Sequence, residues 1–82
     1  MIFFSVTGPW EGNCQDANGM YLEDTLIRGN IGSAEQCLRE CKLKENVSGC
    51  MYNDEKECAF YTSPTVAKGS GENGIQCWKI EA

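Results

Sequence analysis

The clearest pattern along the chain is a helical spacing of apolar residues near its middle. These apolar positions are Ala34, Cys37, Leu38 and Cys41. Intervals of three and four residues place them on one face of a helix. Ser33 is a favourable N-cap, and Gln36, three residues later, completes a capping-box sequence. We therefore expect a helix from about residue 34 to about residue 45, ended by Asn46 or Gly49.

The rest of the chain has the pattern of short β-strands separated by turn residues. Strands are expected, in chain order, at residues 21–22, 25–27, 49–53, 57–62, 65–67 and 75–80. Residues 49–53 and 57–62 flank the polar segment 54–56, which indicates a hairpin. Within the second of these strands, Phe60 alternates in phase with Cys58 and is expected in the core.

The first ten residues differ from the remainder because they are mostly apolar. Residues 1–8 have strand character, and Gly8-Pro9 is expected to break the strand. The segment is too short for a signal-peptide core and has no basic flank, so the chain is expected to be a piece of a longer precursor. We divide it into an apolar arm, residues 1–10, and a domain, residues 11–82. A strand or docking arm is favoured over a signal remnant, with Ile2, Phe3 and Phe4 as its candidate assembly residues.

Six cysteines in 82 residues indicate a disulfide framework. They are Cys14, Cys37, Cys41, Cys50, Cys58 and Cys77. A chain of this size buries only ~60–65% of its unfolded surface, and three disulfides would each add roughly 2–4 kcal/mol. Such bonds persist in the secretory path or outside the cell. A zinc site is not expected, because the chain has no histidine and no C-x2-C pair.

The helix restricts how the cysteines can pair. Cys37 and Cys41 lie one turn apart, with Cβ atoms ~5–6 Å from each other, whereas a disulfide needs ~3.8 Å. This excludes three of about 15 pairings and leaves the others open. Cys50 and Cys58 flank the hairpin turn and are the nearest partners. A nested arrangement is then favoured, with Cys41–Cys50 inside Cys37–Cys58 and Cys14 paired with Cys77.

The net charge of −5 argues against anionic partners. The basic residues are scattered at Arg28, Arg39, Lys42, Lys44, Lys56, Lys68 and Lys79. Nucleic acid requires a clustered basic surface, so neither nucleic acid nor an anionic membrane is expected as a partner. No apolar run approaches the ~20 residues of a membrane span.

The order of these features resembles the PAN/apple domain family. The resemblance runs from about Cys14 to Ile80 and is most specific in residues 33–41, 49–53 and 57–61. It implies a small disulfide-rich α+β fold, in which one helix packs on an antiparallel sheet. It also implies the nested pairing, with Cys14–Cys77 as the extra bond of the apple subgroup. Members of this family are extracellular, non-catalytic modules that bind proteins or carbohydrates.

Enzymatic chemistry has little support in the sequence. There is no histidine, and the cysteines are expected to be bridged rather than nucleophilic. The acidic residues Asp54, Glu55 and Glu57 lack the EF-hand spacing and are interpreted as an exposed turn. We therefore expect no catalytic residue, no cofactor and no metal.

Three residues outside the arm are candidates for modification or recognition. Asn46 begins an Asn-Val-Ser sequon at the expected end of the helix, and the interpretation that competes with glycosylation is a helix C-terminal asparagine. Tyr61 is expected to face away from the core, and Trp78 to face away from Cys77. Exposed aromatic side chains bind sugars and partner proteins well, although in a small domain they also serve as core material.

We therefore expect a secreted recognition or adhesion module, part of a larger protein or assembly, that binds an extracellular protein or glycan. A protein ligand is favoured, and the N-terminal arm is a candidate for homo- or hetero-assembly by strand addition. One alternative is a secreted effector such as a toxin or a protease inhibitor, with residues 68–71 as a candidate reactive loop. The other alternative is a structural subunit of an extracellular filament or matrix.

Overall fold

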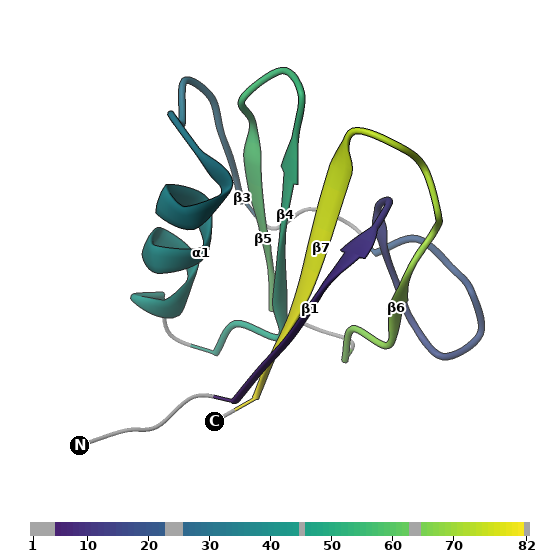
Figure 1. Cartoon of the computed structure of the whole chain (residues 1–82). Helices are drawn as coiled ribbons and strands as arrows, with labels where there is room; N and C mark the ends of the chain where they lie inside the picture. Colours follow the sequence, from purple (N-terminus) through teal and green to yellow (C-terminus); the bar gives the residue numbers. More distant parts are fainter. Residues whose placement is uncertain (1–4, 23–25, 45, 63–64, 82) are drawn as a thin grey trace.

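The computed structural model describes residues 5–22, 26–44, 46–62 and 65–81 (Figure 1). Its centre is a five-stranded antiparallel sheet with the strand order β1-β7-β4-β5-β3. In this order the strands are β1 (Ser5–Glu11), β7 (Ile75–Glu81), β4 (Gly49–Asn53), β5 (Cys58–Tyr61) and β3 (Leu26–Arg28). A helix, α1 (Ala34–Lys42), lies on one side of the sheet, and a small sheet of β2 (Cys14–Gln15) and β6 (Lys68–Gly69) completes the domain. The α+β class expected from the sequence is confirmed.

Helix α1 begins where its sequence predicts. The Ser33 side chain accepts a hydrogen bond from the Gln36 backbone N–H at 3.1 Å, and the Gln36 side chain accepts one from the Gly32 N–H at 3.2 Å. The second bond reaches one residue before the N-cap that a capping box would use. The first bond satisfies a donor that the first turn leaves without an intrahelical partner, and the second joins the chain before the helix to that turn.

The helix ends earlier than expected, at Lys42 rather than about residue 45. The Leu43 N–H donates to Glu40 O at 3.2 Å, and the Lys44 N–H donates to Cys41 O at 3.1 Å. These three-residue spacings tighten the last turn. The chain must return from Cys41 to its disulfide partner Cys50, and each further helical residue would carry it ~1.5 Å along the axis instead.

Both faces of the large sheet are buried. The face toward α1 forms a core of Ile31, Cys37, Cys41, Cys50, Cys58, Phe60, Trp78 and Ile80. The opposite face forms a second core of Cys14, Leu22, Met51, Ala59, Tyr61, Val66 and Cys77. Successive strand residues alternate between these two cores, as the pleat requires. The sheet therefore lies between a helix and a second layer, and the expected core position of Phe60 is confirmed.

The second layer consists of the chain around β2 and β6 (Figure 1). Val66 is fully buried beneath it and packs so closely on β4 that a side chain at Gly49 would collide with it. The short strand expected at residues 65–67 is not present, and the paired residues are instead Lys68 and Gly69. This layer covers the sheet face that a helix-on-sheet pattern alone would leave open.

Strand β1 places most of the expected N-terminal arm at the edge of the large sheet. Gly8-Pro9 does not break the strand. It forms a β-bulge opposite Trp78, and its peptide bond is cis. Gly8 has φ +120°, and a Cβ there would lie 2.7 Å from the Cys77 carbonyl oxygen. Proline is tolerated because an edge strand needs no N–H on its outer side. Residues 2–4 of the expected arm lie outside the described residues.

Three disulfides join the layers. They are Cys14–Cys77, Cys37–Cys58 and Cys41–Cys50, with Cα separations of 5.4, 5.6 and 6.3 Å. This is the pairing that the sequence analysis favoured. The last two bonds attach α1 to the hairpin of β4 and β5, and the first attaches the second layer to β7. All six cysteines are at most 1% exposed, so each bond lies within a core.

Candidate functional site

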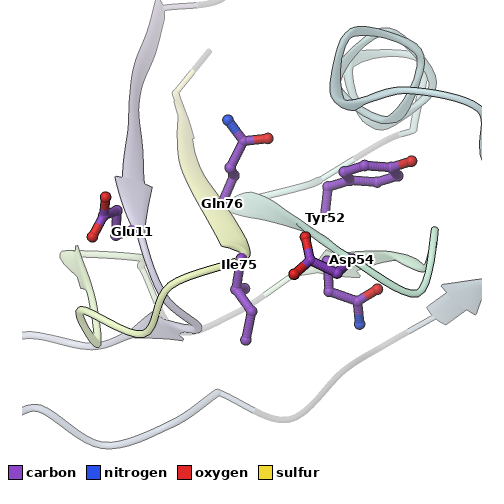
Figure 2. A pocket seen from close by; sticks show the side chains of 7 residues that line it. Glu11, Tyr52, Asp54, Ile75 and Gln76 are labelled. Atoms are coloured by element: carbon purple, nitrogen blue, oxygen red, sulfur yellow. The ribbon is translucent and has the colours of Figure 1, made fainter.

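An open cleft lies at one end of the large sheet and has a volume of about 240 Å³. Strand β1 contributes Glu11. Strand β4 and the turn after it contribute Tyr52, Asn53 and Asp54, and β7 with the turn before it contributes Gly74, Ile75 and Gln76. Figure 2 shows Ile75 and Gln76 between Glu11 on one side and Tyr52 with Asp54 on the other. This volume lies below the roughly 300–1,000 Å³ of most small-molecule sites, so the cleft fits a single side chain better than a whole metabolite.

Strand register brings the side chains of Glu11, Gln76 and Tyr52 to one face of the sheet. Gln76 is the Cα partner of Glu11 on β1 and of Tyr52 on β4. Directly opposed residues of neighbouring strands point to the same face. Two strand spacings separate the outer members of this row, so the Cα atoms of Glu11 and Tyr52 are about 10 Å apart. Gln76 lies between them in this row.

Tyr52 is held rigidly at the border of the cleft. Its hydroxyl donates a hydrogen bond to the Ile31 carbonyl oxygen at 2.7 Å, and its ring packs against the core beneath α1. The hydroxyl is therefore already occupied within the domain. The ring contributes an aromatic surface to the cleft without a free polar group.

The turn that carries Asp54 is organised by Asn53. The Asn53 side-chain oxygen accepts hydrogen bonds from the N–H groups of Glu55 and Glu57, both at 3.0 Å, and its amide donates to Glu57 Oε1 at 3.0 Å. Such side-chain-to-backbone bonds fix a turn in one conformation. Across the cleft, Gly74 has φ +85° and lies so close to Asp54 that a Cβ there would collide with the carboxylate. The glycine at position 74 therefore leaves room for the Asp54 carboxylate.

The cleft carries negative charge that nothing nearby neutralises. Glu11 and Asp54 are its two charged lining residues, and no lysine or arginine lines it. Within the described residues, neither carboxylate accepts a side-chain hydrogen bond or forms an ion pair; the two ion pairs there are Arg28–Glu40 and Lys79–Glu81. The Gln76 amide adds an uncharged donor and acceptor, whereas the Asn53 amide is engaged within its own turn. The site therefore suits a cationic group.

The two aromatic residues proposed from sequence as recognition residues are not available for that role. Tyr61 is 2% exposed and Trp78 is 5% exposed. The predicted alternation of side chains along the last strand is confirmed, because Trp78 does face away from Cys77. The expectation was wrong because both faces of the sheet are covered. Trp78 lies under the layer of α1, and Tyr61 lies under the second layer with Val66.

The remaining sequence candidates lie apart from the cleft. Asn46 is exposed in a turn after α1, with φ +59°. The expected reactive loop, residues 68–71, does not project from the domain. Lys68 and Gly69 pair with β2, the Ser70 N–H donates to Asn13 O at 3.0 Å, and the Gly71 N–H donates to Glu11 O at 2.8 Å. Ile2, Phe3 and Phe4 lie outside the described residues.

Sequence reasoning missed the cleft as a unit. It identified the acidic turn that holds Asp54, but it placed Glu11 at the start of the domain, outside any expected strand, and Gln76 within an ordinary strand. The pairing of β1 with β7 brings them together, and that contact joins residues about 65 positions apart, Glu11 with Gln76. The one local signal was Asn53-Asp54 at the hairpin turn, a sequence typical of a rigid Asx turn.

Among the described residues, no group of three or more cysteine, aspartate or glutamate side chains is arranged to hold a metal ion. In the same part of the chain, α1 is too short and too polar to cross a membrane. No family model matches the chain, and no curated protein or solved structure matches it significantly.

Proposed function

We propose that this chain is a non-catalytic recognition module of the PAN/apple type that works outside the cell and binds a partner protein. The family assignment is supported by the resemblance of residues 33–41, 49–53 and 57–61, and by the nested disulfides that this resemblance implied. Three disulfides in a domain of 82 residues hint at an oxidising environment. Secretion of the chain and a role in adhesion are parts of the same proposal.

The observation that carries the proposal is a preformed cleft on a scaffold stapled by three buried disulfides. The cleft walls come from three neighbouring strands and an Asn53-centred turn, so little order has to be gained when a ligand enters. Preorganisation of this kind lowers the entropic cost of binding. A small domain with such a site can bind usefully without a large apolar interface.

A protein ligand is favoured over a sugar. Sugar sites commonly rest on an exposed aromatic platform, and the two aromatics first considered for it, Tyr61 and Trp78, are buried. The cleft instead presents two carboxylates, and no lysine or arginine among the described residues lines it. Charged side chains of a protein partner match this surface better than the neutral hydroxyls of a glycan.

Asn46 belongs to the proposal as a glycosylation site. It is exposed, and it starts the only Asn-X-Ser/Thr sequence of the chain. Asn46 precedes the first residue of β4, whereas the cleft residues Tyr52 and Asn53 are the last two residues of that strand. A glycan there would leave the cleft accessible. Expression in a eukaryotic secretory host should give material whose mass falls on treatment with a peptide N-glycosidase, and Asn46→Gln should remove the difference. A wild-type mass equal to that of the bare chain would contradict this part.

Assembly through the N-terminal arm is also proposed, but its test needs a different truncation from the one that the sequence suggests. Residues 5–11 form β1, so deletion of residues 1–10 would remove a strand of the sheet. Deletion of residues 1–4 removes Ile2, Phe3 and Phe4 and keeps the strand. Sedimentation of the full chain and of this truncated chain measures the effect. Loss of a complex with an unchanged fold supports the arm, and an unchanged complex contradicts it.

The recognition function is tested by binding of the oxidised chain to arrays of extracellular proteins and of glycans. We expect selective binding to one or a few proteins, and loss of that binding after reduction and alkylation of the six cysteines. Selective binding to glycans alone would replace the protein ligand by a sugar. The absence of selective binding on both arrays would contradict the proposal. Inhibition of a trypsin-like protease would instead support the effector alternative.

A further inference from the structure

We propose that the cleft binds the side chain of a single arginine presented by the partner protein. This inference rests on the proposed function and adds the chemistry that the site recognises. Its basis is a cleft of about 240 Å³ that combines two unpaired carboxylates with one aromatic ring.

Size is the first argument. A volume of 240 Å³ has room for about eight water-sized groups, because each takes about 30 Å³ in the liquid. An arginine side chain beyond its Cα has seven non-hydrogen atoms, whereas a lysine side chain has five. Arginine fills the cleft, and lysine would leave part of it to water.

Charge is the second argument. Glu11 and Asp54 stand on opposite sides of Ile75 and Gln76 (Figure 2). A guanidinium has five N–H donors spread over a plane, so it can address carboxylates from two directions at once. An ammonium group is a compact point charge and would favour one of them. The Gln76 amide, between the two, supplies a further acceptor.

The Tyr52 ring is the apolar surface on the face that carries Glu11 and Gln76, because the Ile75 side chain points to the opposite face and packs against the second core. The Tyr52 ring is fixed by the hydrogen bond of its hydroxyl to Ile31 and offers a surface for stacking of the guanidinium plane. Net charge of −5 on the whole chain favours approach of a basic partner.

The test is a titration of the full oxidised chain, labelled with ¹⁵N, with three blocked amino acids: N-acetyl-arginine methylamide, its lysine equivalent and its citrulline equivalent. Citrulline has nearly the shape of arginine without its charge. We expect the arginine compound to shift the amide resonances of Glu11, Asp54, Gly74 and Gln76. The lysine compound should bind more weakly, citrulline should not bind, and added salt should weaken the arginine complex.

Matched variants locate the interaction. Glu11→Gln and Asp54→Asn each remove one charge with little change of shape, and each should weaken binding of the arginine compound roughly two- to fivefold, as expected for exposed ion pairs. Glu35→Gln is the control, because it makes the same charge change on the outer face of α1. It should leave the affinity unchanged.

Several results would overturn the arginine site. They are shifts that persist in both Glu11→Gln and Asp54→Asn, equal binding of citrulline, tighter binding of lysine, or the absence of localised shifts. Binding to the partner found on the protein array distinguishes failure of the arginine site from failure of the wider recognition function. Partner binding that both variants leave unchanged would overturn the arginine site and keep the recognition function. Arginine binding without any selective protein partner would contradict the recognition function and keep the cleft chemistry.

Discussion

The disulfides should contribute unequally to stability, and the structure gives the order. The perturbation is the replacement of each bonded pair by alanine, in three separate double variants: Cys14→Ala with Cys77→Ala, Cys37→Ala with Cys58→Ala, and Cys41→Ala with Cys50→Ala. Every one of these cysteines is at most 1% exposed. Each variant therefore loses a similar amount of buried side-chain volume, and the differences between variants report mainly on the loops that the bonds close.

The magnitude follows from loop length. The bonded residues are 63, 21 and 9 positions apart. Closure of such loops in the unfolded chain corresponds to about 4.3, 3.3 and 2.6 kcal/mol respectively. The inner bonds already shorten the path between the outer cysteines, which lowers the first two values but keeps the order. Loss of Cys14–Cys77 should thus cost up to about 1.7 kcal/mol more than loss of Cys41–Cys50.

Urea and thermal unfolding followed by circular dichroism measure these differences. In a domain of this size 1 kcal/mol corresponds to about 4–8 °C in Tm, so the two extreme variants should differ by roughly 7–14 °C at most. Mass spectrometry after alkylation should confirm that each variant retains two disulfides. Hydrogen exchange adds a local readout. Without Cys14–Cys77, the amides of Ala67 and Ser70, which bond to the β2 region at 2.8 and 3.0 Å, should lose protection first.

The reasoning is refuted if the variant without Cys41–Cys50 is as unstable as the variant without Cys14–Cys77, or less stable. That order would mean that the attachment of α1 to β4, and not closure of the long loop, dominates the contribution of the disulfides.

Three single substitutions test local features. Ser33→Ala removes the N-cap acceptor of α1 and should cost about 1 kcal/mol in urea unfolding, with a lower helical signal. Gly49→Ala places a Cβ 2.6 Å from the Trp78 carbonyl oxygen and should destabilise the domain by about 1–3 kcal/mol by thermal unfolding; unchanged stability would mean that β4 can shift. Tyr52→Phe removes the 2.7 Å bond to Ile31 and should cost about 1 kcal/mol by urea unfolding, while arginine binding in the cleft should persist.

Local sequence signals predicted the parts of the fold that depend on neighbouring residues. The N-cap at Ser33 and the hairpin of β4 and β5 follow from spacing and turn chemistry within a few residues. The favoured pairing of the inner four cysteines likewise used helix geometry and the hairpin; Cys14–Cys77 was the remaining pair, and the resemblance to the PAN/apple family implied the whole set. These features were accessible because each is decided by short-range sterics and hydrogen bonding.

The features that sequence could not supply depend on contacts between distant segments. The second layer is formed by two-residue strands with no alternation to detect, and it is held by Cys14–Cys77 and by burial of Val66. Because this layer was not foreseen, Tyr61 was expected at the surface. The end of α1 was misplaced for a similar reason, since favourable helical residues continue past Lys42 while the Cys41–Cys50 bond requires the chain to turn.

The candidate site was the least accessible part. Glu11 belongs to it only because β1 adds to β7 through a bulge at Gly8-Pro9, a sequence that ordinarily signals the end of a strand. Edge position is what permits proline there, and edge position is a property of the sheet rather than of the segment. Asp54 was visible as an acidic turn residue, but its partner across the cleft was not.

The bond between Cys14 and Cys77 also determines how the domain carries mechanical load. Ser5 and Glu81 are paired at one end of the β1–β7 ribbon, so tension applied there pulls the two strands apart from that end, one hydrogen bond after another. The Trp10–Cys77 pair is the last that joins two loaded strands. Beyond it the tension crosses from Cys14 to Cys77 through the covalent bond, and residues 15–76, with the helix and the other two disulfides, bear none of it. Reduction of this single bond would expose the whole interior of the domain to the same force.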